Sequence, residues 1–258
     1  MALNDRQEFI LQALRNTGHV EVDALSREWN VTTQTVRRDL SELCDAGLAI
    51  RTHGGARRVM STSALAYQDR RETRIAEKQA VAVAAADLIP NDASVALNIG
   101  TTTELVAEAL RRHEDLTILS NNINIVHILR EARLRSLIVV GGEVRLSDGA
   151  IVGEDAVAAI ANYKVDYAII GTSSLEPDGS ILDFDPREVA VARAILANAR
   201  KKILVADQSK FEVSAPFRIC AVRDLDYVVM DATPPAPFAK ALEDGGTKLI
   251  TVTGTSIN

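Results

Sequence analysis

Hydrophobic residues recur at three- and four-residue intervals in the first part of the chain, a spacing that predicts amphipathic helices. The expected helices cover residues 6–16, 22–29 and 32–43. In the third, Val36, Leu40 and Leu43 fall on one side and form an apolar stripe, and Thr32 or Thr33 can cap its first turn. Because only a short turn at Asn30 precedes it, the pattern predicts a helix-turn-helix unit.

Two short strand-like runs follow these helices, at 48–51 and 56–59, with a turn at 52–55 between them. Three helices followed by a basic hairpin are typical of a winged helix-turn-helix domain. We expect this domain to cover residues 1–59.

The side of the third helix away from the apolar stripe carries groups suited to DNA. An amide can pair with adenine, a guanidinium can bind guanine or phosphate, and N–H groups at a helix start bind phosphate. Arginines of the wing are expected to contact phosphate. The candidate DNA-binding residues are Thr32, Thr33, Gln34, Thr35, Arg37, Arg38, Arg51, His53, Arg57 and Arg58. A surface helix with solvated arginines and a purely structural hairpin remain the alternatives.

Further along the chain, apolar runs of strand length alternate with helix-like segments. The expected strands are 95–99, 116–119, 137–140, 167–170, 203–205, 227–230 and 248–252. The expected helices are 75–89, 103–112, 123–132, 154–163, 187–199 and 237–243. This alternation predicts an α/β domain with a mostly parallel sheet over residues 75–258, after a linker at 60–74. The charged end of that linker, 68–74, and the helix after it are the candidate for carrying a signal between the domains.

Ligands of open α/β sheets bind at the carboxyl ends of the strands, so the residues after each strand are candidates for binding. Glycine, hydroxyl and lysine residues there favour a phosphate group, and carboxylates accept hydroxyls. The candidate effector-binding residues are Gly100, Thr101, Thr102, Thr103, Asn121, Asn122, Gly141, Gly142, Glu143, Asp183, Asp185, Glu188 and Lys210. Together they predict a pocket for a small phosphorylated and hydroxylated molecule. Any one of these turns, taken alone, is more often an ordinary loop.

The net charge of −6 weighs against nucleic-acid binding, but the charge is unevenly distributed. Residues 1–60 hold eight Arg and eight Asp or Glu, so the rest of the chain carries the whole −6. Within them, positions 37–58 hold five Arg against three acidic residues. A local basic footprint of this kind matters more for DNA binding than the total charge.

The remaining composition narrows the class of protein. No apolar run reaches the roughly 18 residues of a membrane span, and the first residues lack the pattern of a signal peptide. Cys44 and Cys220 form neither a disulfide framework nor a metal-ligand spacing, and the histidines are scattered. We therefore expect a cytoplasmic protein with no metal site, no cofactor and no membrane partner.

These motifs resemble those of the DeoR family of bacterial transcriptional repressors. The resemblance rests on segments 35–40, 53–56, 100–102, 120–122, 141–143 and 207–211, and covers nearly the whole chain. The order and spacing of the motifs make it specific. Within the family, segments 148–154 and 178–185 are most similar to regulators of glycerol 3-phosphate use.

The resemblance implies a second domain with a fold akin to sugar-phosphate isomerases. It also implies a homo-oligomer, a dimer or tetramer, that binds operator DNA and releases it when a phosphorylated metabolite such as glycerol 3-phosphate binds. Asn98 stands where the family usually has Asp, which removes one expected carboxylate and puts the choice of effector in doubt.

Two other functions fit the same residues. Asp183, Asp185, Glu188 and Lys210 are chemically able to act as acid and base in a sugar-phosphate isomerase or deaminase, but such an enzyme has no need of the N-terminal domain. An activator or dual regulator cannot be told from a repressor by the protein sequence, because the position of the operator in the DNA decides between them.

Overall fold

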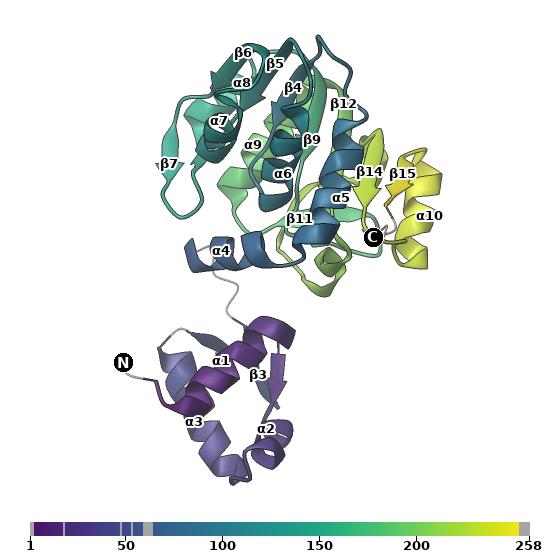
Figure 1. Cartoon of the computed structure of the whole chain (residues 1–258). Helices are drawn as coiled ribbons and strands as arrows, with labels where there is room; N and C mark the ends of the chain where they lie inside the picture. Colours follow the sequence, from purple (N-terminus) through teal and green to yellow (C-terminus); the bar gives the residue numbers. More distant parts are fainter. Residues whose placement is uncertain (1–2, 18, 47, 53, 59–63, 253–258) are drawn as a thin grey trace, which may run out of the picture. The chain divides into compact units, whose positions relative to one another are not determined.

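The computed structural model describes residues 3–17, 19–46, 48–52, 54–58 and 64–252 (Figure 1). Its contacts divide the chain into two compact units, Met1–Ser61 and Thr62–Asn258, and each is described by itself. Among the described residues, none of the helices is both long and apolar enough to cross a lipid bilayer.

The described part of the first unit consists of three helices and a three-stranded antiparallel sheet. Its elements are α1 (Asp5–Thr17), β1 (His19–Glu21), α2 (Val22–Glu28), α3 (Thr33–Asp45), β2 (Ala49–Arg51) and β3 (Gly55–Arg58). β3 lies between β1 and β2. The expected stripe of Val36, Leu40 and Leu43 is fully buried in the core of this unit. The predicted winged helix-turn-helix is thus confirmed, with β1 as an additional strand.

The turn before α3 is fixed by short polar contacts. Asn30 adopts the predicted left-handed conformation, with φ of +49°. The hydroxyl of Ser26 donates to the carbonyl oxygen of Val31 at 2.5 Å. Thr32 is the N-cap, because its Oγ1 accepts a hydrogen bond from the backbone N–H of Thr35 at 3.2 Å. These contacts set where α3 begins and which of its sides faces outward.

The second unit is built on a seven-stranded sheet in which every neighbouring pair is parallel (Figure 1). The strand order is β15-β14-β12-β9-β4-β5-β6. The strands are β4 (Ser94–Leu97), β5 (Leu116–Ser120), β6 (Leu134–Val139), β9 (Val165–Ile170), β12 (Ala199–Ala206), β14 (Tyr227–Met230) and β15 (Lys248–Thr251). All seven predicted strands are present, and the predicted mostly parallel α/β architecture is confirmed.

Helices cover both faces of this sheet. They are α5 (Ile75–Ala86), α6 (Thr101–Leu110), α7 (Ile123–Leu129), α8 (Glu154–Ile160), α9 (Pro186–Ala197) and α10 (Ala236–Gly245). Ile169 of β9 packs in the apolar cluster that contains residues of α5, α6 and α7. Its neighbours Ala168 and Ile170 pack in the cluster that contains residues of α8, α9 and α10. Successive side chains of a strand point to opposite faces of the sheet, and here both faces are buried. Such a strand is therefore apolar at every position and appears in the sequence as a continuous hydrophobic run.

Two smaller sheets were not predicted. Strands β10 (Ser174–Leu175), β11 (Ser180–Asp183) and β13 (Phe217–Ala221) form an antiparallel sheet, and β7 (Glu143–Arg145) pairs with β8 (Ala150–Val152). The 3₁₀ helices are η1 (Gln208–Glu212) and η2 (Val222–Asp224). Most of these strands are too short to show a period in the sequence. Because β11 was not predicted, the position of Asp183 was predicted wrongly. It lies in the small antiparallel sheet and not at the end of a strand of the parallel sheet.

The segment 60–74 differs from the linker that the sequence predicts. Residues 64–72 form helix α4 (Ala64–Glu72), while residues 60–63 lie outside the described residues. Tyr67 of α4 is 8% exposed and donates a hydrogen bond to Glu104 of α6. The hydrogen bond between Tyr67 and the buried carboxylate of Glu104 makes α4 part of the second unit.

Candidate functional site

The predicted DNA-binding side chains lie on the side of α3 that is not buried. Thr32, Gln34, Arg37 and Arg38 are exposed, and Thr33 and Thr35 are half-buried. The Nε of Arg38 lies 3.2 Å from Oε1 of Glu42, one turn further along, and the arginine side chain is 82% exposed. An ion pair as exposed as this one is weak, so DNA phosphate or a base can replace Glu42 as its partner.

The wing is connected to α3 by Arg51 at the end of β2. Its Nη1 donates to the carbonyl oxygen of Arg37 at 3.2 Å. The backbone of β3 places Arg57 opposite Ile50 and Arg58 opposite Ala49. The side chains of Arg57 and Arg58, and the whole of His53, lie outside the described residues.

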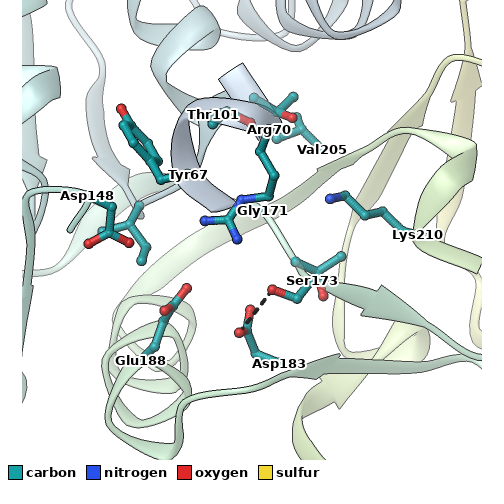
Figure 2. A pocket seen from close by; sticks show the side chains of 14 residues that line it. Tyr67, Arg70, Thr101, Asp148, Gly171, Ser173, Asp183, Glu188, Val205 and Lys210 are labelled. Atoms are coloured by element: carbon teal, nitrogen blue, oxygen red, sulfur yellow. Dashed lines mark hydrogen bonds between the residues drawn. The ribbon is translucent and has the colours of Figure 1, made fainter. Parts of the chain in front are cut away.

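A pocket of about 560 Å³, a volume that includes solvent at its open side, lies in the second unit (Figure 2). Gly100 follows β4, Gly171 follows β9, and Val205 belongs to β12, so the pocket lies at the carboxyl ends of the parallel strands, as expected for this architecture. The predicted effector-binding residues that line it are Gly100, Thr101, Thr102, Asp183, Glu188 and Lys210.

One side of the pocket suits an anion. Gly100 has φ of +141°, a conformation that favours glycine, and brings the chain into the first turn of α6. No side chain caps that turn, and the dipole of α6 adds positive potential there. Arg70 of α4 and Lys210 of η1 extend their cationic groups into the same pocket (Figure 2).

Asp207, which is 1% exposed, is the internal counter-ion on this side. Burial alone raises the pKa of Asp207, but Lys210 and a hydrogen bond from Ser209 more than offset this, so its pKa lies below the usual value. Burial lowers the pKa of Lys210, and Asp207 opposes that change. The pKa of Lys210 thus lies below its usual value, with Asp207 favouring the charged form and burial favouring the neutral form.

The other side of the pocket is acidic and is organised by Arg145. The Nη2 of Arg145 lies 2.8 Å from Oε2 of Glu188, its Nε 2.9 Å from Oδ1 of Asp148, and its Nη1 3.0 Å from Oδ2 of Asp185. Glu188 and Asp148 both line the pocket. One guanidinium of the β7–β8 hairpin thus holds two pocket carboxylates in place.

Burial raises the pKa of two pocket carboxylates, those of Asp183 and Glu188. It raises the pKa of Asp183, although N–H of Phe184 at 2.7 Å and the hydroxyl of Ser173 at 3.1 Å act against it. Burial, together with the nearby Asp183, raises the pKa of Glu188 to about 8, with Arg145 opposing the change. A protonated Glu188 donates a hydrogen bond where an ionised carboxylate only accepts, so this side suits hydroxyl groups, which do both.

Several predicted binding residues support the pocket wall without lining it. The hydroxyl of Thr103 donates to the carbonyl oxygen of Gly100 at 2.8 Å. Asn121 donates to the carbonyl oxygen of Ile151 at 3.0 Å, and Asn122 caps α7. All three are buried, and their hydrogen bonds hold the wall in place, although Oδ1 of Asn121 has no hydrogen-bond partner among the described residues.

The remaining predicted residues lie farther along the wall. Asp185 caps α9 by accepting from the N–H of Arg187 at 2.9 Å. Glu143 is exposed at the start of the β7–β8 hairpin, and neither it nor its neighbours Gly141 and Gly142 line the pocket. Asn98 is buried, its Oδ1 accepts from the N–H of Ile99 at 2.5 Å, and it also lies outside the lining.

The pocket is also lined by residues that are not among the candidate effector-binding residues. They are Tyr67, Arg70, Ile99, Asp148, Gly171, Thr172, Ser173 and Val205. Gly171, Thr172 and Ser173 directly follow a predicted strand, and the sequence already indicates a glycine and hydroxyl turn of the pocket there. Tyr67 and Arg70 lie in the predicted linker, where nothing in the pattern indicated a binding site.

Lys78 of α5 supports the pocket from behind and was also missed. It is 4% exposed, and its Nζ donates to the carbonyl oxygen of Arg70 and, at 3.3 Å, to Oγ1 of Thr101. Burial and the nearby Lys210 lower its pKa to about 8. Within an Ala- and Val-rich helix, a single lysine is easily taken for a solvated residue.

Both units match known protein families. Residues 6–62 match the DeoR-like helix-turn-helix domain, and residues 73–232 match the DeoR C terminal sensor domain. The two matched regions correspond to the winged domain and to the domain that contains the pocket.

Individual relatives align over nearly their whole length. The chain is 37% identical to the glycerol-3-phosphate regulon repressor of Escherichia coli (strain K12), covering 95% of this chain and 97% of the relative. It is 38% identical to the glycerol-3-phosphate regulon repressor of Haemophilus influenzae, covering 96% and 97%. Among solved structures, ribose 5-phosphate isomerase from Plasmodium falciparum overlaps 52% of each chain, with 16% identity and a TM-score of 0.38.

Proposed function

Because this chain belongs to the DeoR family of transcriptional repressors, we propose that it represses a carbon-metabolism operon and leaves the operator when a phosphorylated metabolite binds its pocket. One observation carries the second half of this proposal. The pocket has the uncapped start of α6 and Lys210 on one side, and Asp183 and Glu188 on the other. Such a pocket complements a molecule with a phosphate at one end and hydroxyls at the other.

Glycerol 3-phosphate is the effector that we propose. Two relatives at 37% and 38% identity carry that metabolite in their names, and the molecule has one phosphate and two hydroxyl groups. Its phosphate would lie at Thr101, Thr102 and Lys210, and its hydroxyls at Asp183 and Glu188. Another sugar phosphate is the alternative, since the pocket chemistry is shared by this whole class of molecules.

The DNA-binding half of the proposal rests on α3 and the wing. Residues 1–60 carry no net charge, so one copy of this unit has little general attraction to DNA. We therefore propose a symmetric homo-oligomer, a dimer or tetramer, that places two copies of α3 about one DNA turn, roughly 34 Å, apart on operator DNA in the cytoplasm.

Release of the operator requires that the effector binds one conformation better than the other. A ligand with equal affinity for the DNA-bound and the free form does not change the equilibrium between them, however tightly it binds. In the proposed repressor, the effector stabilises a form whose two α3 helices no longer match the spacing of the operator.

We propose that the acidic residues of the pocket bind the effector without converting it chemically. Asp183, Glu188 and Lys210 are able to transfer protons, but the relatives are named repressors and not enzymes. Incubating the protein with glycerol 3-phosphate or ribose 5-phosphate and following product by NMR tests this point. Turnover that is lost in Lys210→Ala would favour the enzyme instead.

Two measurements test the proposed function directly. Footprinting on the DNA upstream of the protein's own gene should show a protected site that survives competitor DNA. Calorimetry against glycerol 3-phosphate, fructose phosphates, tagatose and deoxyribose phosphates, and free glycerol should show binding of a phosphorylated compound only. Absence of a sequence-selective complex, or binding of unphosphorylated compounds alone, would refute it.

A further inference from the structure

Arg70 is the pocket cation that α4 contributes (Figure 2). Its side chain extends from α4 toward the space between Lys210, Asp183 and Glu188. Among the described residues, its guanidinium forms no hydrogen bond or ion pair. A half-buried guanidinium with unused donors is suited to a phosphate or carboxylate group, because its planar fork can bind two oxygens at once.

α4 is attached to the rest of the unit through the pocket wall. The Oη of Tyr67 lies 2.7 Å from both carboxylate oxygens of Glu104. Glu104 is 4% exposed and also accepts hydrogen bonds from Asn122 at 3.1 Å and Asn124 at 3.0 Å. Tyr67 is therefore held by a buried network that belongs to α6 and α7.

The last turn of α4 has a second attachment. The ammonium of Lys78 binds the carbonyl oxygen of Arg70, which lies near the C-terminal end of α4, and also the hydroxyl of Thr101 at the start of α6. One buried cation thus joins the backbone of Arg70 to the turn where the phosphate is proposed to bind. A ligand that binds Thr101 and Arg70 would contact both ends of this connection.

We propose that Arg70 binds the phosphate of the effector directly, and that α4 transmits the occupancy of the pocket to the DNA-binding unit. This inference rests on the proposed function and adds a ligand contact and a route of regulation to it. α4 is the first helix after the boundary between the two units at Ser61, so it is the element of the second unit nearest in sequence to the winged domain. An effector that bridges Arg70 and Thr101 holds α4 in one position.

The proposal separates two roles within one helix. Arg70 contributes to the affinity for the ligand, whereas Tyr67 contributes mainly to the coupling, defined as the ratio of operator Kd with and without saturating ligand. By linkage, DNA must change the affinity for the ligand by the same factor. A change at Tyr67 should therefore reduce both effects together.

The test uses the full chain, glycerol 3-phosphate and inorganic phosphate as probes, and calorimetry alongside operator titrations. Arg70→Gln should weaken glycerol 3-phosphate binding by at least ~10-fold, and Arg70→Lys by less, because an ammonium keeps the charge but loses the fork. Arg111→Gln, at the exposed far end of α6, is the matched control and should keep the wild-type Kd. Thermal unfolding of each variant excludes misfolding as the cause of any loss.

The coupling is tested with Tyr67→Phe, which keeps the ring but removes the hydrogen bond to Glu104. It should reduce the coupling at least ~5-fold at saturating glycerol 3-phosphate, while the ligand Kd changes by a smaller factor. Wild-type affinity in Arg70→Gln would overturn the contact, and wild-type coupling in Tyr67→Phe would overturn the route, with the proposed function intact in both cases. If the wild-type chain binds no phosphate ester at all, the proposed function and this inference fail together.

Discussion

Arg6 in α1 pairs with Asp39 in the middle of α3, with Nε 2.5 Å from Oδ2, and the aspartate side chain is only 6% exposed. Gln7 reinforces the contact by donating to Glu42 of α3 at 2.7 Å. α1 therefore holds α3 through its polar side as well as through its apolar stripe. The pair fixes the rotation of α3 about its axis, and with it the direction of Gln34 and Arg37.

Removing Arg6 should destabilise the first unit. Arg6→Ala leaves the buried carboxylate of Asp39 without its partner, which costs roughly 1–3 kcal/mol. Arg38→Ala is the control, because it breaks the exposed pair with Glu42, worth roughly 0.3–0.5 kcal/mol. Urea unfolding of residues 1–61 within the full chain, followed through Trp29, measures both. Equal losses in the two variants would show that the Arg6–Asp39 pair has no special role.

The arginines of α3 should differ from the rest of the surface in their effect on DNA. Arg37→Ala and Arg38→Ala should each weaken operator binding by roughly 1–3 kcal/mol if the side chain contacts a base. If the arginine contacts only phosphate, its removal would instead reduce the salt dependence of binding and leave the sequence preference unchanged. Anisotropy titrations with operator and with scrambled DNA, each at several salt concentrations, distinguish the two. Wild-type affinity in both variants is incompatible with α3 as the reading helix.

Lys210 should contribute to effector affinity through its charge. We expect Lys210→Ala to weaken glycerol 3-phosphate binding at least ~10-fold, since a charge-assisted hydrogen bond to the phosphate is lost. Lys240→Ala, on the exposed face of α10, removes the same charge outside the pocket and should have no effect. Calorimetry on both variants provides the comparison. Equal affinity in the two would place the phosphate away from Lys210.

Glu188 should make stability depend on pH. Its pKa is raised to about 8 in the folded protein, so the folded state binds a proton that the unfolded state releases near pH ~4.5. The resulting stabilisation is complete below that lower value and is lost as the pH rises through about 8. The slope contributed by one such group is at most ~1.4 kcal/mol per pH unit. Thermal unfolding between pH 5 and 9 should therefore show that stability declines less with rising pH in Glu188→Gln than in the wild type. Identical slopes of stability against pH in the two proteins would rule out the raised pKa of Glu188.

The parallel sheet was predictable because its strands are buried on both faces. A segment such as 167–170 must be apolar at every position, and this signal survives in a single sequence. The turn at Gly100 was predictable for a similar reason, since a glycine directly before a hydroxyl-rich helix start is typical of a turn that approaches an anion. In both cases the cause is local in the sequence.

The roles of Tyr67, Arg70 and Lys78 were not predictable because their partners are distant. Tyr67 is paired with Glu104, and Lys78 with Thr101, and a charged segment shows no sign of which of its residues will be buried. The acidic side depends in the same way on Arg145, whose short hairpin strands carry no detectable period. Long-range pairing of polar groups is where sequence patterns contain the least information.

The central claim, operator release by a phosphorylated metabolite, is tested most directly by anisotropy on labelled DNA from upstream of the protein's own gene. The same DNA is titrated with the full chain in the absence and in the presence of saturating glycerol 3-phosphate. The account predicts that the operator Kd rises at least ~5-fold with the ligand, the lower end of ordinary allosteric coupling, and that free glycerol has no effect. An operator Kd that is the same with and without every phosphorylated compound bound by the protein would contradict it.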